Sequence, residues 1–191
     1  MYQSLLKNCD DFHLYVYAFD NTCHEYLSSQ KFEHLTVISL KEFETEELLK
    51  VKSDRTAGEY CWTCSSSTIH HSIITYNLDN CTYLDADMLF YSNPRVLIDE
   101  MGGNSVLITS HRYSLEYDQS LVSGKYCVQF MTFKNTKEGM AVLDWWKNAC
   151  INWCYARVEN GKFGDQKYVD EFETRFTGVY ELKHLGGGIA P

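Results

Sequence analysis

The chain of 191 residues has the length of one domain, and its 45% apolar residues can fill a continuous core. Its formal net charge is −9, with lysine and arginine scattered among the acids, which argues against nucleic acid or an anionic membrane as a surface-wide partner. No apolar run approaches the ~20 residues that span a bilayer, and Met1 opens no signal peptide. We therefore expect a single cytoplasmic domain over residues 1–191, without a transmembrane segment or a nucleic-acid partner.

Strand and helix patterns alternate along the chain. In chain order they predict a strand at residues 13–19, a helix from about 21, a strand at 35–39, a helix from 39 towards 50, a helix at 67–76, strands at 81–84, 105–109 and 126–133, helices at 137–157 and 164–172, and a strand at 179–182. Ser39 and Glu42 have the spacing of a capping box at a helix start. The alternation predicts an α/β fold with a mostly parallel central sheet flanked by helices, and ligands at the carboxyl ends of its strands.

The eight cysteines allow three interpretations. Cys61 and Cys64 have the spacing of a redox dithiol, and Cys150 with Cys154 could complete a zinc site with them. Cys150 and Cys154 also lie one turn apart on an aromatic-rich predicted helix, where buried thiols behave as small apolar side chains. We favour this third interpretation, packing of reduced thiols.

Two carboxylates follow the predicted strand at residues 81–84. Asp85 and Asp87 are separated by one small residue and would hang from the end of that strand. Such a pair supplies hard oxygen ligands that suit Mn²⁺ or Mg²⁺. Because two carboxylates cannot fill an octahedral shell, we expect a diphosphate substrate to complete it. The alternative is an ordinary acidic turn, since an Asp-x-Asp pair is common and weakly specific.

Three segments extend this pattern: Tyr83-Leu-Asp-Ala-Asp87, Phe163-Gly-Asp-Gln166 and His184-Leu-Gly-Gly-Gly-Ile-Ala-Pro191. In this order and spacing they resemble the motifs of the GT-A glycosyltransferases, most nearly the family-eight type and related nucleotide-diphospho-sugar transferases. The resemblance covers nearly the whole chain. It implies a GT-A (Rossmann-like) fold and the transfer of a sugar from a nucleotide-sugar donor, with a UDP-sugar favoured. The acceptor would be a hydroxyl group of a glycan or another molecule, and the cofactor Mn²⁺ or Mg²⁺.

The resemblance also implies roles for individual residues. Asp85, Asp87 and His184 would bind the metal, and Asp85 would contact the donor through it. Asp165 and Gln166 would serve the donor sugar and the transfer step, with Gln166 near the reacting face if the anomeric configuration is retained. From the residues alone, His184 is equally well a cap of the last strand, and Asp165 a helix N-cap.

Three further residues are expected at the donor. Arg55 precedes a predicted helix and could reach a diphosphate through charge-assisted hydrogen bonds, although a solvated surface arginine is nearly as good an interpretation. Gly187 belongs to a glycine run whose backbone can approach a ligand closely. Gln129 stands where many members of the resembled family contact the donor sugar. Ala190 stands where that family has a lysine, which leaves more of the phosphate charge to the metal.

The start of the chain, from Met1 to Leu5, resembles the end of the first helix of that family. We therefore expect the first strand of the family, with its nucleotide-binding loop, to be missing from this sequence. Three alternatives stay open: a nucleotidyltransferase that makes sugar nucleotides, a non-catalytic nucleotide- or sugar-binding fragment, and a redox protein built on Cys61 and Cys64.

Overall fold

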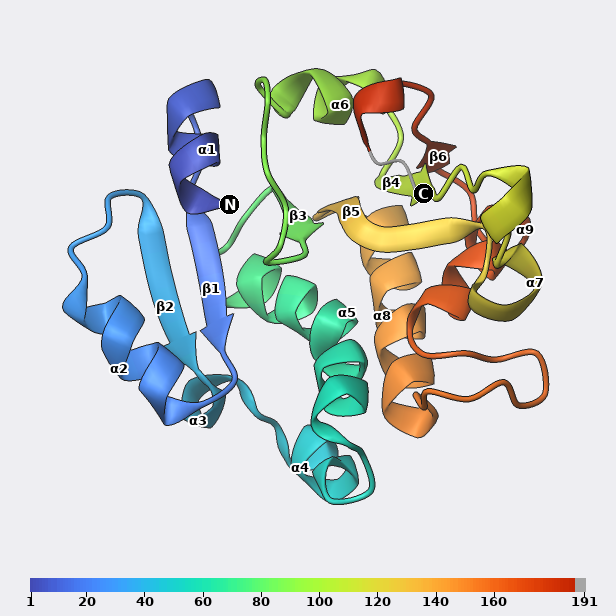
Figure 1. Cartoon of the computed structure of the whole chain (residues 1–191), viewed down its shortest axis with the longest axis horizontal. Coiled ribbons are helices and arrows are strands. Elements are labelled where there is room, and N and C mark those ends of the chain that lie inside the picture. Colours follow the sequence, from blue (N-terminus) through green and yellow to red (C-terminus); the bar gives the residue numbers. More distant parts are fainter. Residues whose placement is uncertain (188–191) are drawn as a thin grey trace.

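The computed structural model describes residues 1–187, which form an α/β arrangement of two β-sheets and surrounding helices (Figure 1). The first sheet pairs β1 (Leu14–Ala18) with β2 (Leu35–Ser39). The second has the order β3-β5-β4-β6, and its strands are β3 (Asn80–Leu84), β5 (Tyr126–Lys134), β4 (Val106–Ser110) and β6 (Val179–Glu181). The end of the third motif, residues 188–191 with Ala190, lies outside the described residues.

The prediction of one mostly parallel central sheet is wrong. The strands form two sheets, and β5 runs antiparallel to both β3 and β4, whereas β1–β2 and β4–β6 are parallel. A parallel connection normally needs a crossover helix. Between β4 and β5 the chain forms only the 3₁₀ turn η1 (Leu115–Tyr117) and the short helix α7 (Ser120–Ser123), so β5 returns antiparallel beside β4.

Most of the longer helices begin where a side chain caps their free N–H groups. The remaining helices are α1 (Tyr2–Asn8), α2 (Asn21–Ser29), α3 (Leu40–Phe43), α4 (Glu46–Lys52), α5 (Ala57–Thr75), α6 (Arg95–Glu100), α8 (Lys137–Asn152) and α9 (Phe172–Arg175), with 3₁₀ turns η2 (Gln166–Glu171) and η3 (Leu185–Gly187). The capping box of Ser39 and Glu42 is confirmed. The helix predicted from 39 towards 50 is broken, because Thr45 caps a second helix by accepting from the N–H of Leu48.

Two apolar clusters cover the two faces of the four-stranded sheet. Along β4, Val106 and Ile108 pack with residues of α5 and α8, while Leu107 between them packs with residues of α1 and α6. This alternation is what a strand between two layers of helices requires. A third cluster joins the β1–β2 sheet to α3, α4 and α5, and its buried members are Ile38, Phe43, Leu48, Tyr60 and Cys64. Within residues 1–187, no helix is long and apolar enough to cross a membrane.

The cysteines support the packing interpretation. Cys150 and Cys154 are fully buried in the core beneath the four-stranded sheet. Cys61 and Cys64 lie inside α5 instead of at a helix N-terminus, and burial raises the pKa of Cys61 and raises that of Cys64 to about 12. A redox thiolate needs a lowered pKa, so this environment disfavours the dithiol interpretation.

Candidate functional site

The acidic pair lies where β3 ends against β5. The backbone N–H of Asp85 donates to the carbonyl oxygen of Gln129 at 3.2 Å, which continues the β3–β5 ladder by one residue. The chain then turns at residues 86–87. Asp85 is half-buried, whereas Asp87 is exposed at the tip of the turn. The sequence prediction that both carboxylates hang from the end of this strand is confirmed.

Helix α1 holds the far end of this loop. The hydroxyl oxygen of Ser4 accepts from the N–H of Phe90 at 3.0 Å, and the amide nitrogen of Asn8 donates to the carbonyl oxygen of Phe90 at 3.1 Å. Phe90 itself is buried in the cluster above the sheet. The loop that carries Asp85 and Asp87 is therefore fixed at both ends.

Asp165 reaches the same place from the segment that follows α8. Gly164, with φ of +53°, adopts a left-handed conformation that an L side chain rarely takes, and it turns the chain into the core. The indole N–H of Trp146 donates to the carbonyl oxygen of Asp165 at 2.9 Å. Asp165 stands at the N-cap position of η2, but its side chain makes no capping bond. Hydrogen bonds from Ser65 of α5 and from the backbone N–H groups of residues 165 and 166 act on its carboxyl. The N-cap interpretation does not describe this side chain.

Burial, with a smaller contribution from neighbouring carboxylates, raises the pKa of Asp165 and of Asp85. Burial raises the pKa of Asp165 to about 7 against the opposing effect of the Ser65 hydrogen bond, and the nearby charge of Asp85 adds to the rise. Burial also raises the pKa of Asp85, with a further contribution from the charge of Asp87. Burial raises the pKa of the Cys127 thiol to about 11, and the charges of all three aspartates add to it. Three acidic groups and one thiol thus share a single site.

Gln166 and His111 form the polar wall beside this acidic group. The amide nitrogen of Gln166 donates to the carbonyl oxygen of Ser123 at 3.0 Å, so its oxygen accepts from Nε2 of His111 at 3.1 Å. Burial lowers the pKa of His111 against the opposing effect of the Gln166 hydrogen bond, which favours the neutral imidazole. The ring of Tyr113 stacks on His111 with centroids 4.4 Å apart. Gln166 is therefore held in one orientation, as a positioned hydrogen-bonding group requires.

A local irregularity in the sheet accompanies the site. The register between β4 and β5 shifts between Leu107 and Thr109, opposite the stretch of β5 that contains Gln129. Bulges of this kind occur often beside active sites because they redirect side chains. Gln129, predicted from sequence at the donor, is thus adjacent to Asp85 through its backbone.

His184 does not join the two aspartates. It is exposed, its N–H donates to Glu100 at 3.1 Å, and its Nδ1 accepts from the N–H of Gly186 at 3.0 Å, so it closes the turn after β6. Within residues 1–187 no group of three or more His, Cys, Asp or Glu could hold a metal ion. The role of His184 as a third ligand stays a prediction that this geometry does not favour.

Two predicted donor contacts are engaged elsewhere. A Cβ on Gly187 would lie 2.0 Å from the side chain of Leu182, so this glycine allows tight packing. The guanidinium of Arg55 lies 3.8 Å from the ring centroid of Tyr155 and donates to the carbonyl oxygen of Ile151 at 3.5 Å. Both residues have structural partners, and their contact with a donor stays a prediction.

Three further residues belong to the site without having been assigned to it from sequence: Ser65, Cys127 and Tyr113. Ser65 comes from the middle of α5 and bonds to Asp165. The only local signal is the run of three serines at residues 65–67 in a helix that is otherwise largely buried.

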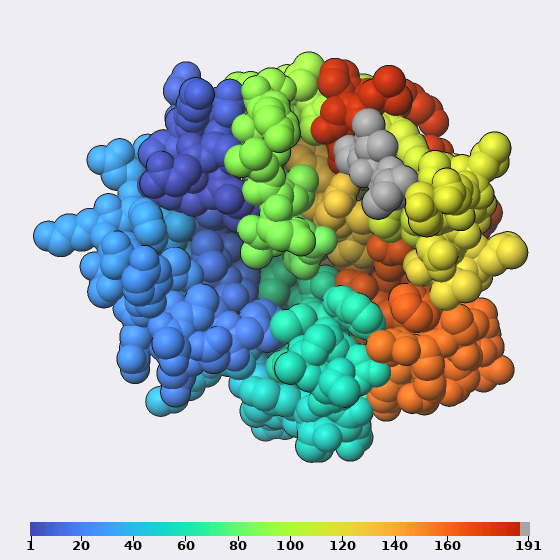
Figure 2. All heavy atoms as spheres, in the orientation of Figure 1, coloured from blue at the N-terminus to red at the C-terminus, as the bar shows by residue number. Residues whose placement is uncertain are grey.

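Figure 2 shows a hollow near the centre of one face, between the green segment after β3, the teal atoms of α5 and the orange segment before η2.

The fold and site define an α/β protein with a partly buried group of acidic side chains near the end of β3. No family model matches the sequence. The chain is similar to two proteins of Bacillus subtilis (strain 168) that are described only as uncharacterized. It is 34% identical to YfnD over 197 residues, which cover 100% of this chain and 62% of YfnD. It is 29% identical to YfnF over 199 residues, which cover 99% of this chain and 65% of YfnF. The chain thus spans less than two thirds of the length of either relative.

Proposed function

We propose that this chain is the catalytic part of a metal-dependent glycosyltransferase with a GT-A fold. It would move a sugar from a nucleotide-diphosphate sugar, with a UDP-sugar favoured, to a hydroxyl group of a glycan or another acceptor. The observation that supports this most is that Asp85 lies close enough to Asp87 for their charges to interact, and close enough to the buried Asp165 to raise its pKa. Two of the three motifs that resemble the family are distant in sequence and lie together at this point.

The donor set suits a hard divalent cation. Asp85 and Asp87 offer carboxylate oxygens, and the raised pKa of Asp85 reflects burial and repulsion that a cation would relieve. The pair is open on the solvent side, since Asp87 is exposed. Mg²⁺ and similar ions are usually held by one or two carboxylates together with water and substrate phosphates. When bound, Mn²⁺ or Mg²⁺ would supply positive charge to the departing nucleoside diphosphate.

The other residues of the site would position the sugar. Gln166, oriented by Ser123 and His111, can hydrogen-bond to sugar hydroxyls or to the ring oxygen without reorganising, which is the property that makes preorganised groups effective. Asp165, buried behind it and bonded to Ser65, would fix the floor of the sugar site. The ladder bond from the N–H of Asp85 to Gln129 fixes the backbone that carries the metal-binding carboxylate.

The first test measures the binding of UDP by calorimetry, with Mn²⁺ and with EDTA. We expect Mn²⁺ to strengthen UDP binding by at least tenfold, about 1.4 kcal/mol. Asp87→Asn should abolish this coupling and leave the melting temperature unchanged, because Asp87 is exposed and its side chain supports no part of the core.

The matched control is Asp54→Asn, an exposed aspartate in the turn between α4 and α5, which should keep the full coupling. Equal UDP affinity with Mn²⁺ and with EDTA in the unmodified chain would contradict the proposal. Coupling that survives Asp87→Asn would remove the acidic pair from the metal site.

A further inference from the structure

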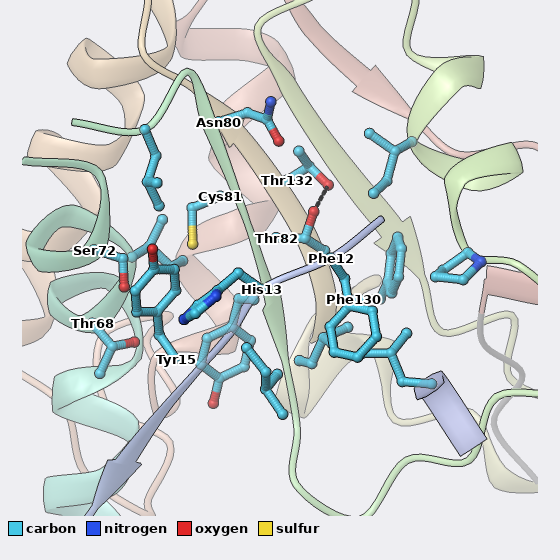
Figure 3. Close-up of a pocket in the computed structure, with 18 of the residues that line it drawn as sticks. Phe12, His13, Tyr15, Thr68, Ser72, Asn80, Cys81, Thr82, Phe130 and Thr132 are labelled. Atoms are coloured by element: carbon cyan, nitrogen blue, oxygen red, sulfur yellow. Dashed lines mark hydrogen bonds between the residues drawn. The ribbon is translucent and has the colours of Figure 1, made fainter. Parts of the chain in front are cut away.

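A cavity of about 770 Å³ separates the two sheets. Residues of β1 line one side and all five residues of β3 line the other, with α5 beneath and Met1 and Leu5 above. Figure 3 shows side chains from both strands, among them Tyr15 and Cys81, converging on the open space between them. In Figure 1 the same space lies between the arrows of β1 and β3.

The two strands turn free edges towards this cavity. On β3, the bonds from Asp85 N–H to Gln129 and from Asn135 N–H to Asp79 lie at either end of the ladder with β5. Because hydrogen-bonded pairs alternate along an antiparallel ladder, the backbone groups of Thr82 point away from β5 and into the cavity.

β1 also directs alternate backbone groups away from its partner strand. The N–H of Leu14 donates to the carbonyl oxygen of His34, so in the parallel ladder with β2 the alternate residues, Tyr15 and Tyr17, direct their backbone groups to the other side. That side is the cavity, which both residues line. Two rows of unpaired donors and acceptors therefore face one partly open space, which is the arrangement that attracts another strand.

β1 and β3 are much less buried than the interior strand β4. β4 is buried at all five of its positions, whereas β1 has one buried residue and β3 has none. Interior strands of a sheet covered by helices on both faces are normally buried throughout. β1 and β3 are covered by helices as interior strands are, but they are as exposed as edge strands. Both strands line the same cavity, which accounts for their exposure.

We propose that this cavity receives one further β-strand, an extended and mostly apolar segment of about five residues that pairs with β1 and β3 and joins the two sheets into one. Five residues span about 17 Å, the length of β1 and β3 themselves. The segment is apolar because Ile69 of α5 lies on one side of the cavity and Phe12 and Phe130 line the other. The proposal does not depend on the proposed function.

The source to which we commit is the same polypeptide, outside the 191 residues. About a third of YfnD and of YfnF lies outside the part that this chain matches, so the relatives possess additional chain. Met1 lines the cavity, so a segment joined to it has a short path to the free edges. A strand held in the same polypeptide would also protect two edges that otherwise favour aggregation.

The first experiment titrates the chain with a fluorescein-labelled heptapeptide of alternating valine and threonine, capped at both ends, and follows fluorescence anisotropy. We expect saturable binding of one peptide per chain. Thr82→Pro removes a backbone donor that faces the cavity and leaves the backbone bonds between β3 and β5 in place. It also removes the bond between the hydroxyl groups of Thr82 and Thr132, as Thr82→Val does. Thr82→Pro should weaken binding at least tenfold. Thr82→Val keeps that N–H and should bind as the unmodified chain does.

A second control does not depend on the stability of any variant. The same peptide with methylated nitrogens at alternate residues cannot pair on both edges and should not bind. Hydrogen exchange of the complex should show new protection at Tyr15 and Tyr17 on β1 together with Thr82 on β3. Absence of binding, equal binding by the methylated peptide, or protection of only one strand would overturn the proposal.

The source is tested with YfnD. Its region equivalent to this chain should bind the heptapeptide, and full-length YfnD should not, because its own segment already fills the cavity. Equal binding by both forms would overturn the same-polypeptide source. A dimer of this chain that dissociates in Thr82→Pro would show that a second copy fills the cavity, which would equally overturn it.

Discussion

A buried carboxyl group such as that of Asp165 couples its titration to folding. Its pKa rises from 3.8 in the unfolded chain to about 7 in the native state. Between these values the native state binds a proton that the unfolded state has lost, so stability falls as pH rises from about 4 to about 7 and is level above that. The shift of about three units corresponds to a loss on the order of 4 kcal/mol.

Asp165→Asn removes this titration while keeping the size of the side chain. In urea denaturation with EDTA, the variant should lose much less stability than the unmodified chain between pH 4 and 7, and it should be the more stable protein above pH 7. Cys127 and Cys150 face the same region, but the pKa values of both thiols lie far above pH 7. Asp85 also faces this region, and it is the same in both proteins. Parallel pH profiles for the two proteins would show that Asp165 is ionised in the native state.

A substitution of Gln166 should affect the reaction at the sugar much more than the binding of the nucleotide. Since its carboxamide is held by Ser123 and His111 on the side of Asp165, we expect Gln166→Ala to lower Mn²⁺-dependent release of UDP from UDP-sugars at least tenfold. UDP affinity should change by less than twofold. Gln119→Ala, at an exposed glutamine before α7 whose side chain makes no capping bond, is the control. An unchanged rate with weakened UDP binding would place Gln166 at the nucleotide.

At this scale the sequence identified the residues whose signal is local. Asp85 and Asp87 follow a strand directly, so the local pattern places them, whereas Asp165 and Gln166 were assigned only through the resemblance of their motif. Ser65 enters the site only because α5 packs beneath β3, a contact that no local pattern encodes. Arg55 illustrates the opposite case, since the partner that engages it, Tyr155, is a hundred residues away in sequence.

Two glycines near helix starts, Gly139 and Gly58, differ in the space around them. A Cβ on Gly139 of α8 would lie 2.3 Å from the carbonyl oxygen of Lys134, which is backbone and cannot move aside. Gly58 of α5 has no heavy atom within 4 Å of such a Cβ. Alanine in a helix is favoured over glycine by up to about 1 kcal/mol, so Gly58→Ala should stabilise the protein.

Gly139→Ala should have the opposite sign and cost about 1–3 kcal/mol, because the first turn of α8 must move away from the end of β5. Thermal and urea unfolding of the two variants measure the difference. If both substitutions stabilise the protein, the close approach of α8 to β5 is absent in solution.

Helix ends were predictable where a capping box marks them and misjudged elsewhere. Ser39 with Glu42 was recognised, but the equivalent pair Thr56 and Glu59 was not, so the start of α5 was placed ten residues late. The carboxylate of Glu59 also accepts from the N–H of Ala156, a contact between distant segments. The predicted end of α8 lay beyond Asn152 because the aromatic spacing continues after the helix has ended.

For the whole molecule, the type and order of the strands were predictable but their pairing was not. Composition and alternation indicate which residues form strands, because both are local properties. Whether β5 pairs antiparallel with β3 and β4 depends on how short helices carry the chain between them. The strands form two sheets because, within residues 1–187, no strand pairs with the free edges of both β1 and β3.

This division predicts unequal stability across the chain. β1 and β2 pair only with each other and have one buried residue each, whereas β4 and β5 are buried almost throughout. A two-stranded sheet is marginal by itself, and the third apolar cluster is the main contact that holds it to α5. Native-state hydrogen exchange of the chain alone should therefore show β1 and β2 opening at least tenfold more readily than β4 and β5.

Two substitutions should change this difference in opposite directions. Leu48→Ala, in the third cluster, should increase the difference in opening between the two pairs of strands. Val142→Ala, beneath β5, should lower the global stability and reduce that difference. Equal protection of all four strands would contradict this prediction. If neither substitution changed the protection of β1 and β2 relative to β4 and β5, the two sheets would unfold as one cooperative unit.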